Sequence, residues 1–234
     1  MENEKEKKDE NKEKKGFNFS FLESIRIEDD EKIIELEKQE EERQEEERKR
    51  KLEENYKKIA PFRYLNESLE TYKASPENKK SYDWILGFCK AVENHKNKKN
   101  LIYLNGKSGT GKTHLALGMI RELGGQLITS LELCITYDSC RDFNSSKTRI
   151  QFLKDLCRQK VLVIDEIGKG IERIEKEIVP YIINEFYNDS GKILIFTGNE
   201  KNEDFEKLIG ESSTDRFNGN GIYLSLVGES QRKK

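Results

Sequence analysis

The feature that most constrains this chain is a glycine-rich stretch between a strand-like and a helix-like segment. Residues 101–105 have strand character, residues 106–113 follow the pattern G-x-x-x-x-G-K-T, and a helical pattern opens directly afterwards. Glycines at these positions let backbone N–H groups turn inward around a phosphate, and the helix adds its positive N-terminal end. The flanking strand and helix argue against a chance glycine-rich turn. The predicted nucleotide-binding residues are Gly106, Lys107, Ser108, Gly109, Thr110, Gly111, Lys112 and Thr113.

Within this loop, two side chains have the chemistry of a metal–nucleotide site. Lys112 supplies a positive charge for the β- and γ-phosphates, and the Thr113 hydroxyl is suited to binding Mg²⁺. We therefore expect ATP and Mg²⁺ as the cofactors of this chain.

A second landmark follows about fifty residues later. Residues 161–164 are four consecutive apolar residues, typical of a strand buried on both faces of a parallel sheet, and Asp165 and Glu166 follow at its carboxyl end. Ligands of open α/β sheets bind at that end. We expect Asp165 to hold the magnesium ion and Glu166 to activate the attacking water. Asn199, after the strand-like residues 192–197, is placed to bond the γ-phosphate and that water, although it could also be a simple turn residue.

The remaining pattern alternates strands and helices. Residues 126–129 and 222–226 also have strand character. Helical periodicity covers residues 77–92, 113–123, 150–157 and 171–187. The first of these helices is expected to open with Ser75 as the N-cap and Pro76 at the first helical position. Pro180 predicts a kink or a split in the last of these. Residues 218–221, just before the last strand, are glycine-rich. This order predicts an α/β fold with a parallel sheet.

The N-terminal part differs in composition from the rest. Residues 1–58 hold 21 acidic and 16 basic residues, a net charge of −5, whereas residues 59–234 have a net charge of +3. We expect a boundary near residue 59, a disordered tail over residues 1–16, and a solvated helix over residues 31–58 with i,i+4 pairs such as Glu53–Lys57. Residues 17–27 carry clustered apolar side chains that either fold back onto the protein or dock into a partner.

Several classes of protein are disfavoured. No apolar run approaches the ~20 residues that span a bilayer, and the charged N-terminus does not resemble a signal peptide, so we expect a cytoplasmic protein with no membrane association. The four cysteines form no C-x-x-C pair, which disfavours zinc and predicts reduced, mostly packed thiols. The near-neutral charge balance disfavours nucleic-acid binding by charge alone.

Taken in order, these motifs resemble those of the AAA+ ATPases, and among them the DnaC-type helicase loaders and the related IstB transposition ATPases. The resemblance covers about residues 56–232. It rests on GKSGTGKTH at 106–114, VLVIDEIG at 161–168, TGN at 197–199, DRF at 215–217 and GESQR at 228–232, together with residues 61–64.

The resemblance implies a five-stranded parallel sheet of order 5-1-4-3-2 in a subunit that assembles into a ring or spiral. It makes residues 106–113 Walker A, with His114 beside them, and Asp165 and Glu166 Walker B. It makes Asn199 the first sensor, Arg216 the arginine finger that reaches a neighbouring subunit, and Arg232 a second-sensor arginine. Many relatives have Arg-Tyr where this chain has Phe186-Tyr187, so at this position the chain departs from the family pattern and lacks that arginine.

The implied function is ATP-dependent loading of a replicative, DnaB-like helicase onto single-stranded DNA. Only eight residues follow Leu226, so we expect no C-terminal lid, and the partner-binding arm would be N-terminal. Residues 131–149, with Arg141, Lys147 and Arg149, are a candidate DNA-facing element. Two alternatives are open: an IstB-like transposition helper, and an adaptor that binds ATP but barely hydrolyses it.

Overall fold

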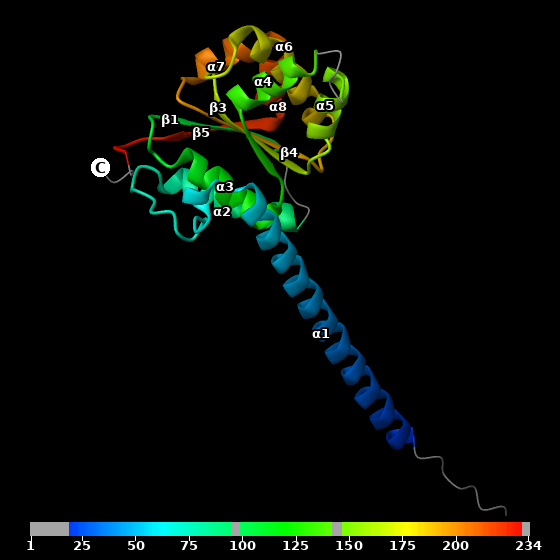
Figure 1. Ribbon diagram of the computed structural model, residues 1–234. Helices are drawn as coiled ribbons and strands as arrows, with labels where there is room; N and C mark the ends of the chain where they lie inside the picture. The colour runs from blue at the N-terminus through cyan, green and yellow to red at the C-terminus, as the bar shows by residue number, and fades with distance from the viewer. Residues whose placement is uncertain (1–18, 95–98, 142–146, 231–234) are drawn as a thin grey trace, which may run out of the picture. The chain divides into compact units, whose positions relative to one another are not determined.

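The computed structural model describes residues 19–94, 99–141 and 147–230, and side chains from residue 32 onward within these ranges (Figure 1). The chain forms two compact units, Met1–Arg48 and Lys49–Lys234. The predicted tail over residues 1–16 lies outside the described residues, and so does Arg232. None of the described helices is long and apolar enough to cross a membrane.

The first helix, α1, covers Phe19–Ile59 and therefore begins twelve residues earlier than the predicted start at residue 31. Its backbone includes most of the apolar segment 17–27, of which residues 17 and 18 lie outside the described part. The predicted Glu53–Lys57 pair is present at 3.5 Å. The boundary between the two units falls inside α1, because side chains of its last turns pack into the second unit; Tyr56 is only 1% exposed.

The second unit is built on a five-stranded parallel sheet. Its strands are β1 (Leu101–Gly106), β2 (Gln126–Thr129), β3 (Val161–Ile167), β4 (Ile193–Gly198) and β5 (Gly221–Leu226). Their order is β2-β3-β4-β1-β5, which confirms the predicted order 5-1-4-3-2 read from the other edge. In register, Asn105 of β1 pairs with Gly198 of β4, so the strand ends that carry the predicted site residues are neighbours.

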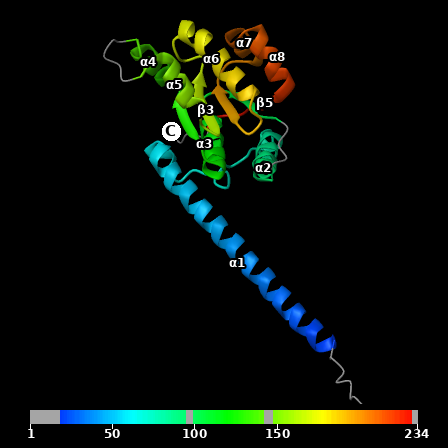
Figure 2. The same cartoon turned by 90° about the vertical axis from the view of Figure 1, so that its right-hand side faces the viewer.

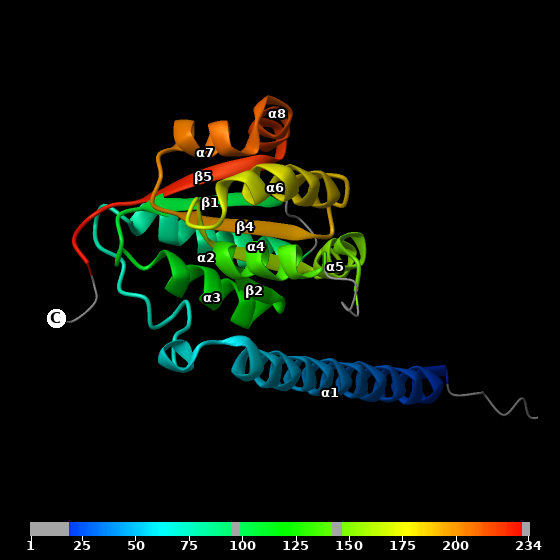
Figure 3. The same ribbon diagram turned by 45° about the horizontal axis from the view of Figure 1, so that its top comes forward.

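Helices cover both faces of this sheet, as Figures 2 and 3 show. The helices of this unit after α1 are α2 (Lys79–Glu93), α3 (Lys112–Leu123), α4 (Ser130–Ser139), α5 (Arg149–Leu156), α6 (Glu172–Tyr187), α7 (Asn202–Ile209) and α8 (Glu211–Asn220), with a short 3₁₀ turn at Phe62–Tyr64. Alternate residues of β1 feed two separate cores: Leu101 and Tyr103 face the α4–α8 side, and Ile102 and Leu104 face α2 and α3.

One helix start was predicted wrongly, and one helix was not predicted. The helix expected to open at Ser75-Pro76 begins only at Lys79, because residues 75–78 close a turn in which Asn78 N donates to Ser75 O (3.0 Å). The side chain of Asn78 instead bonds the backbone of Val227, with N–O distances of 2.9 and 2.8 Å. The helix that was not predicted is α8, whose last residues, 218–220, belong to the glycine-rich stretch. Tertiary packing overrides the local propensity there, since Phe217 is fully buried 5.4 Å from the ring of Phe205.

Pro180 lies inside α6, which runs as one helix from Glu172 to Tyr187, so the predicted split does not occur. The missing N–H of Pro180 removes the bond to the carbonyl of Lys176. The helix survives because its apolar face, including Val179 and Ile183, is fully buried against the sheet. The four cysteines are free, and three of them, Cys89, Cys134 and Cys157, are buried as predicted.

Candidate functional site

The predicted phosphate loop connects the end of β1 to the start of α3. Gly109 and Gly111 adopt positive φ values of 85° and 95°, and Gly111 caps α3 in the left-handed conformation. A Cβ atom on Gly111 would lie 2.5 Å from a ring carbon of Tyr72. Both the turn and this close approach therefore require glycine.

Lys112 joins the loop to the end of β4. Its side chain is 8% exposed, and Nζ donates to the carbonyls of Gly106 (2.7 Å) and Lys107 (2.9 Å). It also donates to Asn199 Oδ1 at 2.9 Å. A buried ammonium that is bonded to two carbonyls of its own loop lies where it can meet an anion cradled by that loop. The structure thus brings two predicted site residues into direct contact.

Thr113 and Asp165 form the second contact of the site. Thr113 Oγ1 donates to Asp165 Oδ1 at 3.0 Å, and Asp165 is only 6% exposed. A hydroxyl and a carboxylate oxygen are the hard oxygen ligands that Mg²⁺ prefers when most of its remaining ligands are water and phosphate. The donor set of these two residues therefore fits the expected magnesium ion.

Glu166 follows in an unusual backbone conformation. Within the described part of the chain it is the only non-glycine residue with positive φ, at 58°. Its side chain is exposed, while its backbone N–H donates to Thr197 Oγ1 at 3.0 Å. Non-glycine residues in this conformation carry strain of about 1–3 kcal/mol and gather at functional sites. A strained backbone at Glu166 fits a residue whose side chain must point in a defined direction for catalysis.

Lys112, Thr113, Glu166 and Asn199 line one cleft of about 650 Å³ at the carboxyl ends of the strands, and the buried Asp165 is bonded to Thr113 of this lining. Its walls come from the phosphate loop, from the ends of β3 and β4, and from a preceding segment. The lining residues are Tyr64, Glu67, Thr71, Lys73, Ser108, Gly109, Gly111, Lys112, Thr113, His114, Glu166, Thr197, Gly198 and Asn199. The predicted loop and both strand tips therefore converge on one space large enough for a small-molecule ligand.

Comparison with known proteins agrees with this geometry. Residues 28–234 match the family of IstB-like ATP-binding proteins. The chain belongs to this family. It is similar to the replicative helicase loader DnaC of Buchnera aphidicola, with 32% identity over 182 residues, which cover 73% of this chain and 71% of that one. With DnaC of Escherichia coli K12 it shares 32% identity over 136 residues, and it spans about half (55%) of that relative's length.

Solved structures share the fold of this IstB-like protein. A crystal structure of the DnaC helicase loader has 24% identity and a TM-score of 0.58, and covers 71% of this chain and all of that one. DnaA from Aquifex aeolicus bound to AMPPCP has 22% identity and a TM-score of 0.56, covering 71% of this chain and 51% of that one. At these identities the likeness shows a shared fold, in agreement with the predicted α/β fold with a five-stranded parallel sheet.

Other predicted residues of this IstB-like protein lie outside the cleft lining. Arg216 on α8 donates to Ser212 Oγ (2.7 Å), and its guanidinium lies 5.8 Å from the ring centroid of Tyr187. In the candidate DNA-facing element, Arg149 pairs with Asp138 at 2.7 Å and Lys147 with Asp155 at 2.6 Å.

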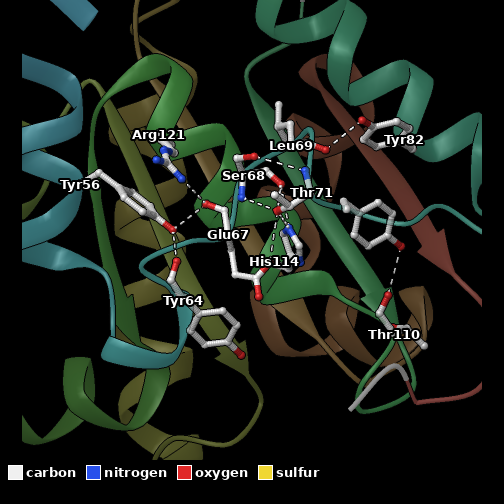
Figure 4. A network of polar contacts seen from close by, with 11 residues as sticks. Tyr56, Tyr64, Glu67, Ser68, Leu69, Thr71, Tyr82, Thr110, His114 and Arg121 are labelled. Atoms are coloured by element: carbon white, nitrogen blue, oxygen red, sulfur yellow. Dashed lines mark hydrogen bonds and ion pairs between the residues drawn. The ribbon is translucent and has the colours of Figure 1, made fainter. Parts of the chain in front are cut away.

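His114 borders the cleft, but its ring nitrogens are engaged by the chain segment before α2. Nε2 lies 2.7 Å from Ser68 O, and Nδ1 lies 3.1 Å from Glu67 Oε2. Figure 4 shows His114 beside Glu67, Ser68 and Thr71. His114 thus fixes the position of residues 67 and 68, and Glu67 belongs to one wall of the cleft.

Two residues that support the site were not predicted as site residues from the sequence. Thr197 is fully buried, and its hydroxyl donates to Asp165 Oδ1 while accepting from Glu166 N (3.0 Å). Glu175 on α6 is 1% exposed; its Oε1 accepts from Ser130 Oγ, Gly168 N (3.0 Å) and Gly170 N (3.1 Å) and so holds the loop after Glu166. The T-G-N motif already contained Thr197, but no local signal marks Glu175 among the charged residues of a helix.

Proposed function

We propose that this protein is an ATP-dependent helicase loader, which binds a replicative DNA helicase and helps to place it on single-stranded DNA. The observation that carries the proposal is one cleft lined by Lys112, Thr113 and Asn199, with Asp165 bonded to Thr113, in a chain whose similar relatives are named helicase loaders. The same relatives favour a loader over a transposition helper.

Binding of the nucleotide is assigned to the phosphate loop. Backbone N–H groups of residues 106–113 would cradle the phosphates, and Lys112 would exchange its loop carbonyls for phosphate oxygens. Thr113 and Asp165 would hold Mg²⁺, whose chemistry at this place is to neutralise charge on the β- and γ-phosphates. Arg232, by its resemblance to a second-sensor arginine, is proposed as a further contact to the nucleotide.

Hydrolysis is assigned to Glu166 and Asn199. Glu166, whose carboxylate is exposed at the cleft, would accept a proton from the attacking water. Asn199 would orient that water and the terminal phosphate through hydrogen bonds. Arg216 lies outside the cleft lining of its own subunit and is proposed to serve the cleft of a neighbouring subunit, so that hydrolysis depends on assembly.

The macromolecular partners are assigned to two other regions. Residues 17–27 at the start of α1 are proposed to dock on the helicase through their apolar side chains. Residues 131–149 are proposed to face the DNA, with Arg141, Lys147 and Arg149 as the contacts to phosphates.

A co-purification experiment from the native host tests the loader proposal. We expect the tagged full-length chain to retain a hexameric helicase, and a variant lacking residues 1–30 to lose it while keeping ATP turnover. Recovery of a transposase without a helicase would overturn the proposal. Retention of the helicase by the shortened variant would move the docking surface away from residues 17–27.

A second experiment separates an ATPase from a nucleotide-gated adaptor. In Glu166→Gln the carboxylate is replaced by an isosteric amide that accepts no proton, so we expect nucleotide affinity to persist and steady-state hydrolysis to fall by about 10²-fold or more. Equal turnover by the variant and the wild type would contradict the assigned base. A wild-type chain that binds ATP without turnover, alone or with DNA and helicase, would establish the adaptor instead.

A further inference from the structure

The segment from residue 64 to residue 72 lies between the end of α1 and the helix that follows the phosphate loop (Figure 4). It runs along one face of α3, formed by His114, Gly118 and Arg121 at i, i+4 and i+7. A Cβ atom on Gly118 would lie only 2.9 Å from Leu69 N, so the segment lies directly on the helix. We refer to residues 64–72 as the strap.

Arg121 connects the strap to α1. Its guanidinium donates twice to the carboxylate of Glu53 (2.8 and 3.0 Å) and once to Glu67 O (3.0 Å). It also lies 5.1 Å from the centre of the Tyr56 ring. The side chains of Arg121 and Glu53 are 26% and 32% exposed, so water and salt screen this bidentate pair less than the more exposed Arg43–Glu40 and Arg48–Glu45 pairs on α1.

Tyr56 connects α1 to the strap directly. Its hydroxyl donates to Tyr64 O at 2.7 Å and lies 3.1 Å from Glu67 O. Burial raises the pKa of Tyr56, so the hydroxyl keeps its proton and remains a donor. The last turns of α1 thus hold the start of the strap at two backbone carbonyls.

The other side of the strap forms part of the cleft. Tyr64, Glu67 and Thr71 line it, and Tyr72 OH donates to Thr110 O of the phosphate loop at 3.2 Å. A shift of the strap would therefore change both a wall of the cleft and a contact of the loop. The contacts from Glu53 to Thr110 are continuous, each made by a bonded or packed pair.

We propose that Glu53 and Tyr56, which lie outside the cleft, are positioning residues for nucleotide binding that act through Arg121 and the strap. The inference rests on the proposed nucleotide site. Because such coupling is reciprocal, a bound nucleotide also tightens the attachment of α1 to this unit. The proposed helicase-docking segment lies on the same helix as Glu53 and Tyr56, so a partner on α1 would change affinity for ATP through these contacts.

Equilibrium binding of a non-hydrolysable ATP analogue to the full-length chain tests the proposal. We expect Glu53→Ala to bind about 5- to 10-fold more weakly than the wild type, at the lower end of the couplings of about 5- to 150-fold found between sites. Glu54→Ala is the matched control, since the neighbouring Glu54 is exposed and pairs only along α1 with Arg50 (3.9 Å). Its affinity should equal that of the wild type.

A second pair of variants tests the contribution of the Tyr56 hydroxyl. Tyr56→Phe should weaken binding in the same way, whereas Tyr223→Phe, which loses a bond to Glu206 (3.0 Å) away from the strap, should not. Hydrogen exchange compared with and without the analogue supplies a second readout, which locates the effect in the chain: the analogue should slow exchange over residues 56–72 in the wild type and less so in Glu53→Ala.

The possible outcomes distinguish failure of the nucleotide site from failure of the positioning role. A wild type that does not bind the analogue would overturn both the nucleotide site and the positioning role. A wild type that binds, with Glu53→Ala and Tyr56→Phe equal to their controls, would overturn the positioning role alone. Slower exchange restricted to the phosphate loop would also overturn it.

Discussion

The sharpest test of the site geometry is the substitution Thr197→Val. Thr197 is fully buried at the end of β4, and its hydroxyl connects the two acidic residues that end β3. Valine has nearly the same shape but neither donates nor accepts a hydrogen bond. The substitution therefore removes two hydrogen bonds with almost no change in packing volume.

The expected loss of stability follows from these two bonds. The bond to the Asp165 carboxylate is charge-assisted and contributes about 1.5–3 kcal/mol. The N–H of Glu166 loses its acceptor, which costs about 1–3 kcal/mol; the lower end applies because Glu166 is exposed and its N–H can reach water. The sum is about 3 kcal/mol, and at about 2–4 °C per kcal/mol for a domain of this size Tm should fall by about 6–12 °C.

Thermal unfolding without nucleotide measures this effect, and Thr197→Ser is the matched control. Serine keeps the hydroxyl and loses one methyl group, so its cost should be about 1 kcal/mol. We also expect Thr197→Val, but not Thr197→Ser, to slow ATP hydrolysis, because Glu166 loses the bond that holds its left-handed backbone. Equal Tm values for the valine and serine variants would refute the reasoning.

The remaining predictions concern the neighbouring subunit and the thiols. Arg216→Ala should leave binding of ATP nearly intact and reduce assembly-dependent hydrolysis by about 10³–10⁵-fold, as for other arginine fingers, and unchanged turnover would exclude a trans-acting role. Burial raises the pKa of the Cys89 and Cys157 thiols to about 12, so at pH 8 they stay protonated and unreactive, and their alkylation should begin only as the pH approaches that value. At pH 8 a thiol reagent should therefore modify the half-buried Cys140 first in the native chain and all four cysteines after denaturation, whereas four fast-reacting native thiols would contradict the packing.

Much of the fold follows from local patterns in the chain. The strands β1, β3 and β4 contain short apolar runs, buried on both faces; the predicted runs match β1 and β4 to within one residue at each end, and β3 continues three residues beyond the predicted run 161–164. The errors lie where local signals conflict with packing. Residues 211–220 contain glycine, serine and asparagine, yet form α8 because Phe217 anchors them among Phe205 and Tyr223. Ser75 and Pro76 form part of a turn, but the helix predicted to begin there starts later.

The sequence by itself determined the chemistry of the site, because that chemistry resides in short stretches. A loop around phosphate needs glycine where φ is positive, and a strand buried on both faces needs a continuous apolar run, so both leave a mark within a few residues. Only the tertiary structure decided the contacts that carry the inferred coupling and the support of the site. Arg121 meets Glu53 across 68 positions, and Thr197 meets Asp165 across 32. Such pairs depend on how the elements pack, and no spacing along the chain records which distant charge or hydroxyl will be brought beside another.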